Sequence, residues 1–416
     1  MLDLSSIDFK DIYCTDEAAS LQPERYSRAI EEFTKAFPGI EPQAIFSAPG
    51  RTEIGGNHTD HQHGEVLAAS INKDAIAVVS PLNSDSVNVI AEGFGMTNID
   101  INDLELKEDE KGTTSALIRG VLAGLRNNGY TLGGFNAYIT SDVLIGAGLS
   151  SSAAFETLVG TIVSGLYNDM SVDAVKIAKI GQYAENTYFG KPCGLMDQTA
   201  CSVGNLVYID FMDPAEPDVR HIDFDFSKTG YSLCITDTKG SHADLTDEYA
   251  AVPNEMRTVA SLLGHSVLRS VTMDDILDNI EMLRANAGDR AVLRAIHFVN
   301  ETKRAREEAG ALEQGDFDRF LNLVKLSGDS SFKYLQNVYT NKDVTVQNVS
   351  LALAVSDSAL GSGEVSRVHG GGFAGTIQAF VKNENASKYQ ALMDKVFGAG
   401  SCEILSIRKY GGIRII

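Results

Sequence analysis

The chain has 416 residues, and its 56 Asp and Glu against 35 Lys and Arg give a formal net charge of −21. This balance argues against nucleic acid or an anionic membrane surface as the main partner. The five cysteines are scattered without the spacing of a metal knuckle, which is typical of reduced thiols. The N-terminal stretch is acidic and lacks the pattern of a signal peptide, and no run approaches 18 apolar residues. We therefore expect a cytoplasmic protein without a membrane partner.

Apolar periodicity and turn residues predict an α+β protein with two lobes and mixed or antiparallel sheets. An active site between the lobes is a common arrangement in such proteins and is expected here. The acidic segment 212–221, which holds two prolines, is the predicted boundary between an N-terminal domain (1–212) and a C-terminal domain (213–416). We expect strands within 64–90 and at 135–139, 203–211, 231–238, 374–382 and 402–409. We expect helices at 153–167, 171–189 (capped by Ser171), 254–263, 272–286, 289–328 and 386–397.

The segment 145–156, IGAGLSSSAAFE, joins a glycine turn to three serines and an apolar helix. The glycines let the backbone approach a ligand closely, and a helix N-terminus offers free N–H groups to a phosphate. The segment is neither a Walker motif nor a dinucleotide fingerprint. A pattern this short is, more often than not, only a glycine turn followed by a serine cap.

The segment 47–64, SAPGRTEIGGNHTDHQHG, concentrates polar side chains among glycines. Its histidines His58, His61 and His63 lie close together, but spacing alone does not define a zinc site and no cysteine is near. The alternatives are a solvated loop and a loop that hydrogen-bonds a polyhydroxy ligand. A third segment, RVHGGGFAGTIQAF (367–380), leads from a glycine turn into a strand, and alone it indicates only a tight turn.

Together these segments resemble, in order and spacing, the three motifs of the GHMP kinase superfamily, and within it the galactokinase family. The first motif appears as Pro49-Gly50-Arg51 followed by Gly56-Asn57-His58-Thr59-Asp60. The second and third appear as residues 146–153 and 370–375. A fourth segment, AENTYFGKPCGLMDQ (184–198), is similar to the family stretch with the catalytic aspartate. The resemblance extends from about residue 20 to the C-terminus.

The resemblance implies transfer of the ATP γ-phosphoryl group to the anomeric hydroxyl of a hexose. Asp197 would lie beside that hydroxyl with Arg51 next to it, and Ser152 and Glu185 would hold Mg²⁺, which prefers hard oxygen ligands. ATP phosphates would bind Gly146, Ala147, Gly148, Leu149, Ser150, Ser151 and Ser152. The sugar would bind Asn57, His58, Asp60, Gly194 and Tyr249. The family also implies a monomer whose partners are only the sugar and ATP.

Two departures from the family concern the sugar. Asn57 stands where the family has a glutamate facing the sugar C6 position, and Ala250-Ala251-Val252-Pro253 replaces the usual basic residues after Tyr249. Galactose is the expected substrate. The alternative is a C6-modified galactose such as galacturonate, because Asn57 removes a repulsive charge. A silent sugar and ATP sensor is disfavoured by the retained catalytic set, and a mevalonate or homoserine kinase by the His-Thr-Asp segment.

Overall fold

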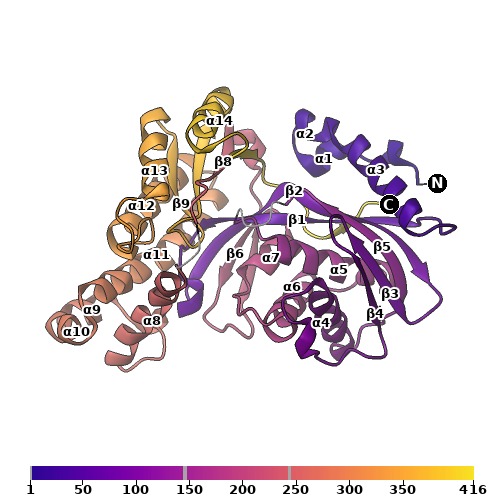
Figure 1. Cartoon of the computed structure of the whole chain (residues 1–416). Coiled ribbons are helices and arrows are strands. Elements are labelled where there is room, and N and C mark those ends of the chain that lie inside the picture. The colour runs from indigo at the N-terminus through magenta and orange to yellow at the C-terminus, as the bar shows by residue number, and fades with distance from the viewer. Residues whose placement is uncertain (1, 144–147, 242–244) are drawn as a thin grey trace. The chain divides into compact units, whose positions relative to one another are not determined.

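The computed structural model describes residues 2–143, 148–241 and 245–416, and its two sheets with flanking helices confirm the predicted α+β class. The chain forms two compact units (Figure 1). Unit 1 comprises residues 1–52, 69–205 and 407–416, and unit 2 comprises 53–68 and 206–406. The structure thus divides the chain into units of several segments each, whereas the sequence predicts a single boundary after residue 212. The long strands β1 (Ala44–Gly55) and β2 (Glu65–Leu82) carry the chain out of unit 1 and back, and its C-terminus returns to unit 1.

Unit 1 is built on a mixed sheet with the strand order β12-β1-β2-β5-β3-β4. Strand β3 is parallel to β5, whereas the pairs β1–β12, β2–β5 and β3–β4 are antiparallel. Both faces of this sheet are covered, so β1 and most of β2 are buried along their length. The remaining strands are β3 (Ser86–Ala91), β4 (Met96–Asp100), β5 (Gly134–Ser141) and β12 (Ile413–Arg414).

Two helical layers cover the sheet of unit 1 (Figure 1). One layer packs Leu158, Ile162 and their neighbours against the sheet in the main core, and the other packs Tyr26 and Phe33 on the opposite face. The first layer consists of α4 (Thr114–Asn127), α5 (Ser151–Tyr167), α6 (Ala174–Tyr183), the π-helix η4 (Ala184–Phe189) and α7 (Met196–Val203). The second consists of α1 (Phe9–Tyr13), α2 (Asp16–Ser20) and α3 (Gln22–Ala36). Short 3₁₀ turns are η1 (Leu4–Ser6) and η3 (Glu108–Glu110).

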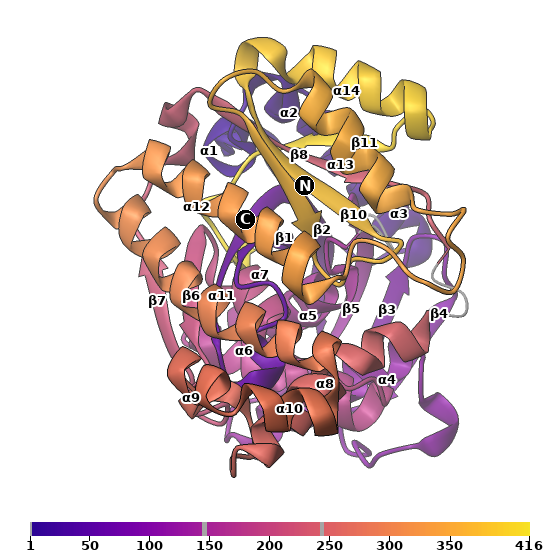
Figure 2. The same cartoon turned by 90° about the vertical axis from the view of Figure 1, so that its left-hand side faces the viewer.

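Unit 2 contains an antiparallel sheet with the order β11-β8-β10-β9 (Figure 2). Ile377, Ala379 and Val381 of β10 face α13 and α14, and Phe380 on the other face meets Phe320 of α12. The strands are β8 (Tyr231–Asp237), β9 (Val365–His369), β10 (Thr376–Lys382) and β11 (Cys402–Leu405). Unit 2 also contains the hairpin of β6 (Leu206–Asp210) and β7 (Asp218–Ile222), in which β6 pairs with β2 as well as with β7.

The helices of unit 2 lie between β8 and β11 in the sequence, where β9 and β10 precede the last of them. They are α8 (Thr246–Leu262), α9 (Met273–Asp278), α10 (Ile280–Ala287), α11 (Asp289–Glu313), α12 (Phe317–Ser330), the π-helix η7 (Ser331–Leu335), α13 (Asn348–Ala359) and α14 (Asn383–Phe397). The 3₁₀ turns of unit 2 are η2 (Asp60–Gln62), η5 (Phe226–Thr229) and η6 (Leu268–Ser270), of which the first two precede β8. Within the described ranges, no helix is both long and apolar enough to cross a membrane.

Several predicted helices differ from the observed ones. The stretch expected as one helix at 272–286 forms α9 and α10, and the helix expected at 254–263 is the C-terminal part of α8, which begins at Thr246. The helix expected at 171–189 begins at Ala174, because Asp173 rather than Ser171 accepts the capping hydrogen bonds from two backbone N–H groups. It then widens into η4 and ends at Gly190 in the left-handed conformation. The stretch expected as one helix at 289–328 forms α11 and α12 instead, because the chain turns at Gly315, whose φ is +69°.

Candidate functional site

The serine segment lies at the start of α5 in unit 1. Gly148 and Ser150 have φ values of 67° and 58°, so the chain turns sharply before the helix begins at Ser151. Within the described part of this turn, no side chain caps α5, and its first N–H groups are left for an anion. Gly146 and Ala147, also predicted to bind phosphate, lie outside the described residues.

Arg51 and Asp197 form a two-point ion pair at this helix start. Arg51 Nε and Nη2 donate to the two carboxylate oxygens of Asp197, each at 2.7 Å, and Nη1 donates to the Gly148 carbonyl at 2.5 Å. The Ser150 hydroxyl also donates to Asp197. Burial alone would raise the pKa of Asp197, but Arg51 and these hydrogen bonds outweigh it and hold the pKa below its ordinary value. Asp197 is therefore ionised at neutral pH, and a third of its side chain stays exposed.

Glu185 lies in η4, and π-helical turns often occur at functional sites. Its Oε1 accepts hydrogen bonds from the Ser152 hydroxyl at 3.1 Å and from Lys191 Nζ at 3.0 Å. The structure therefore brings together the two predicted metal ligands. These two side chains fit Mg²⁺, because both supply hard oxygen ligands. Oε1 of Glu185 already forms an ion pair with Lys191, so a positive charge is accommodated at this oxygen.

In unit 2, the Asn57 side chain is buried and its hydrogen-bonding groups are engaged. Its Nδ2 donates to Glu53 Oε1 at 3.0 Å and to the Gly370 carbonyl at 2.7 Å. Its Oδ1 accepts from Asn337 Nδ2 at 3.0 Å and from the Ser331 hydroxyl at 3.3 Å. Because both amide hydrogens are used, the geometry disfavours Asn57 as a donor to a substituent at the sugar C6 position.

The other predicted sugar residues of unit 2 gather around the glycine turn of the third motif. Tyr249 donates its hydroxyl hydrogen to the Gly372 carbonyl at 2.9 Å, and His58 Nε2 lies 3.2 Å from the Gly371 carbonyl. A Cβ at Gly371 would lie 2.8 Å from the Tyr249 ring, so glycine is required for this close approach. Asp60 begins the η2 turn two residues beyond His58 and is partly exposed. Gly194, in unit 1, is exposed two residues before α7.

The histidines of the first motif do not form a metal site. His58 Nδ1 and His61 Nε2 are 3.4 Å apart. Burial is the main cause that lowers the pKa of His61 well below its ordinary value, and the nearby His58 lowers it further. Among the described residues, no group of three His, Cys, Asp or Glu side chains is placed to hold a metal ion.

Sequence reasoning missed two side chains next to Glu185. Glu156 and Gln198 are fully buried, and Gln198 Nε2 donates both to Glu185 Oε2 and to Glu156 Oε2, at 2.8 and 3.1 Å. One signal was available, because Glu156 interrupts a helix that is otherwise apolar nearly all round. A carboxyl group at such a position is rarely buried without a specific partner.

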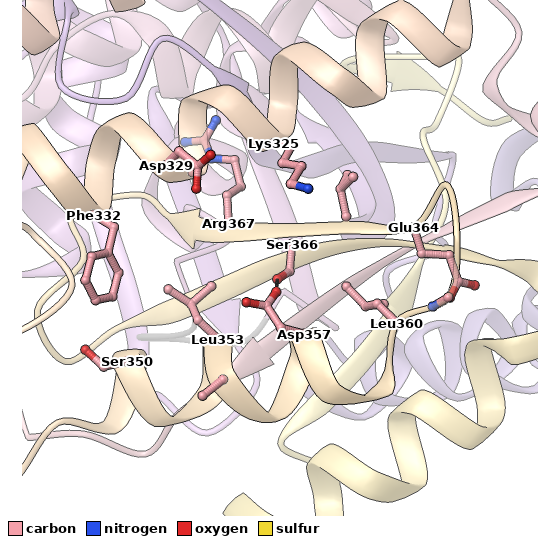
Figure 3. A pocket seen from close by; sticks show the side chains of 14 residues that line it. Lys325, Asp329, Phe332, Ser350, Leu353, Asp357, Leu360, Glu364, Ser366 and Arg367 are labelled. Carbon is pink, nitrogen blue, oxygen red and sulfur yellow. Dashed lines mark hydrogen bonds between the residues drawn. The ribbon is translucent and has the colours of Figure 1, made fainter.

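A pocket of about 520 Å³ lies in unit 2 among α12, α13 and β9 (Figure 3). Leu353 and Phe332 line it together with the charged Lys325 and Asp357. None of the described candidate site residues contributes to its wall, and its buried Arg367 donates its hydrogen bonds to groups of the protein. We therefore place the candidate site at the motifs and not in this pocket.

Two family models match the chain. Residues 31–81 match the galactokinase galactose-binding signature, and residues 116–205 match the N-terminal domain of GHMP kinases. The galactokinase of Streptomyces coelicolor is 31% identical over 380 residues, which cover 90% of this chain and 94% of that protein.

Solved structures share the fold. The galactokinase of Lactococcus lactis, solved in complex with galactose, has a TM-score of 0.77 at 23% identity, covering 94% of this chain and 99% of that one. The mevalonate kinase of Methanococcus jannaschii has a TM-score of 0.61 at 16% identity and covers 89% of this chain and 99% of that one. At these identities the likeness shows the GHMP kinase fold alone.

Proposed function

Because the chain belongs to the galactokinase family and is a sugar kinase, we propose that it transfers the γ-phosphoryl group of ATP to the anomeric hydroxyl of galactose. The observation that carries this proposal is the ion pair of Arg51 and Asp197 at the start of α5, where the side chain of the N-cap residue Ser150 does not cap the helix. It combines a proton acceptor, a fixed cation and the backbone N–H groups of a helix start, the groups that phosphoryl transfer to an alcohol requires.

Asp197 accepts the proton of the sugar hydroxyl as that oxygen attacks the γ-phosphorus, and ADP leaves as the bond between the γ-phosphorus and the β,γ-bridging oxygen breaks. The lowered pKa of Asp197 makes the carboxylate a weaker base but keeps it ionised and able to orient the hydroxyl. Arg51 holds the carboxylate at two points and supplies positive charge near the transferring group. The first turn of α5 binds the phosphates through its N–H groups and its positive dipole end.

Ser152 and Glu185 would hold Mg²⁺, which would supply positive charge to neutralise the ATP phosphates. In unit 2, Asp60 is the carboxylate that accepts hydrogen bonds from sugar hydroxyls, with His58 as a further contact. Tyr249 and Asn57 act on the sugar indirectly, because their hydrogen bonds hold the glycine turn of the third motif.

The proposal is tested by incubating the protein with ATP, Mg²⁺ and single sugars (galactose, glucose, galacturonate) and following ADP release. Phosphorus NMR then identifies the phosphorylated position. We expect ADP release with galactose and the appearance of galactose 1-phosphate. Binding of sugar and ATP without ADP release would identify a sensor and overturn the proposal.

We expect wild type to prefer galactose to galacturonate in kcat/KM by on the order of 10-fold or more. The reason is that both hydrogens of the Asn57 amide are engaged within unit 2 and leave no donor for a C6 carboxylate. Comparable kcat/KM values for the two sugars would contradict this expectation and favour the C6-modified substrate.

Ser152→Ala and Glu185→Ala should each raise the Mg²⁺ concentration for half-maximal activity, by about 10-fold or more. Each substitution removes one of the paired oxygen ligands. The measurement is ADP release against Mg²⁺ at fixed ATP and galactose. Asp109→Ala, which removes an exposed carboxylate of unit 1, is the control and should leave the curve unchanged. An unchanged midpoint in both site variants would place the metal elsewhere.

A further inference from the structure

Glu156 is a second buried carboxyl group beside the candidate metal site. It lies on α5 one helical turn after Ser152 and is fully buried. One nitrogen, Nε2 of Gln198, joins it to Glu185, donating to Glu156 Oε2 at 3.1 Å and to Glu185 Oε2 at 2.8 Å. Oε2 of Glu185 thus accepts a hydrogen bond from the buried Gln198 side chain, whereas Oε1 accepts one from the Ser152 hydroxyl.

The residues around Glu156 leave just enough space for its contact with Gln198. Gly181 of α6 packs against the pair, because a Cβ there would lie 3.1 Å from Glu156 Oε2 and 3.2 Å from Gln198 Cγ. Any larger residue would displace the two side chains. Within the described part of the chain, Glu156 Oε1 and Gln198 Oε1 have no hydrogen-bond partner. An apolar residue at 156 would avoid this cost, so the stability of the fold does not explain the glutamate.

Burial, and then the nearby charge of Glu185, raises the pKa of Glu156 well above its ordinary value. The contact through Gln198 is present in the geometry itself, because one nitrogen lies within hydrogen-bonding distance of both carboxyl groups.

We propose that Glu156 is a positioning residue for the cation site: through Gln198 it fixes the orientation of the Glu185 carboxylate, so that Oε1 and the Ser152 hydroxyl present a preformed oxygen pair. This inference rests on the proposed function, in which that pair binds the metal of the metal–ATP complex. Partners that orient a metal ligand commonly change metal affinity 10- to 100-fold when they are removed.

The test compares Glu156→Met, which removes the acceptor at similar volume, with Glu156→Gln, which retains an acceptor oxygen for Gln198. Binding of Mn²⁺ in the presence of ATP is measured from the electron paramagnetic resonance signal of free Mn²⁺, without any turnover. We expect Glu156→Met to weaken Mn²⁺ binding by about 10- to 100-fold and Glu156→Gln to stay within a few-fold of wild type. The KM for galactose should be unchanged in both variants.

Thr157→Val is the matched control, because Thr157 is the buried neighbour on α5 and its hydroxyl has no hydrogen-bond partner among the described residues. Equal weakening in Thr157→Val would show general damage to α5 and overturn the proposal. Wild-type affinity in Glu156→Met, or equal losses in Glu156→Met and Glu156→Gln, would overturn it as well.

Glu156→Asp provides the comparison if Glu156→Met does not fold, since the shorter side chain draws the acceptor away from Gln198. We then expect the weakened Mn²⁺ binding in Glu156→Asp, and wild-type affinity in that variant would overturn the proposal. A wild-type protein that binds Mn²⁺ and ATP but phosphorylates no sugar would contradict the proposed function. The binding comparison among the Glu156 variants would still decide the role of Glu156.

Discussion

Replacing Asp197 by asparagine is expected to lower kcat for galactose phosphorylation by on the order of 10²-fold or more. Asparagine keeps the shape of the side chain and can still accept one hydrogen bond from Arg51, but it cannot take the proton of the attacking hydroxyl. Because Asp197 is held by two Arg51 contacts and the Ser150 hydroxyl, the substitution changes charge more than position. The KM values for ATP and galactose should therefore change only a few-fold.

Steady-state kinetics supply the test, with ATP and galactose each varied at saturating concentrations of the other. Asp173→Asn is the control, because Asp173 is a helix cap of unit 1 outside the site. It should leave kcat close to wild type. If Asp197→Asn turns over near the wild-type rate, Asp197 is not the proton acceptor.

The wild-type pH profile gives an independent check on Asp197. Arg51 and the hydrogen bonds hold its pKa below the ordinary aspartate value, so the carboxylate stays ionised down to about pH 4. Protonation of Asp197 should therefore cause no fall in kcat between pH 8 and pH 5.

The sequence could predict the parts of the site that are local in the chain. A glycine turn followed by serines and an apolar helix is read from adjacent residues, and α5 begins where this pattern places it. The meeting of Arg51 with Asp197, 146 positions apart, came only from the family resemblance. No periodicity or spacing in the chain predicts that contact, because it depends on how β1 and α7 pack within unit 1.

Tertiary packing decides the features that the sequence did not predict. Asn57 was expected to face the sugar because it replaces a family glutamate, yet its amide is engaged by Glu53, Asn337 and the glycine turn. Glu156 was overlooked because a single glutamate in a helix is usually solvated. Its role depends on Gln198, 42 positions later. In both cases the partners are distant in sequence and polar, and hydrophobic patterns carry no information about them.

A buried ion cluster in unit 1 is another group of polar partners that lie far apart in the sequence, and it contributes to the stability of the fold. Asp74 of β2 is fully buried, and its Oδ1 accepts from Arg25 of α3 at 2.6 Å. Its Oδ2 accepts from Arg408 at 2.8 Å and from the Tyr13 hydroxyl at 2.7 Å, and the Ser47 hydroxyl donates to it as well. One carboxylate thus joins the N-terminal helices, two central strands and the C-terminal segment.

Asp74→Asn should lower the free energy of unfolding by about 3–5 kcal/mol, because it leaves two buried guanidinium groups facing a neutral amide. Burial alone would raise the pKa of Asp74, but Arg25 and Arg408 outweigh it and hold the pKa below its ordinary value. A lowered pKa in the folded state means that the ionised carboxylate stabilises the fold throughout the neutral range. This contribution is lost only as the pH falls through that lowered pKa, below about 4.

Urea unfolding of wild type and Asp74→Asn, followed by circular dichroism at several pH values, measures this contribution. The difference between the two proteins should be constant from pH 8 to about 5 and narrow below about 4, where Asp74 of the wild type becomes protonated. Asp16→Asn alters an exposed ion pair with Lys10 and should leave the unfolding midpoint near wild type. An Asp74→Asn protein as stable as wild type at pH 7 would show that the two arginines do not depend on this carboxylate. A difference that widens on acidification would show that the pKa of Asp74 is raised in the folded protein, because its protonated form would then be the stabilising one.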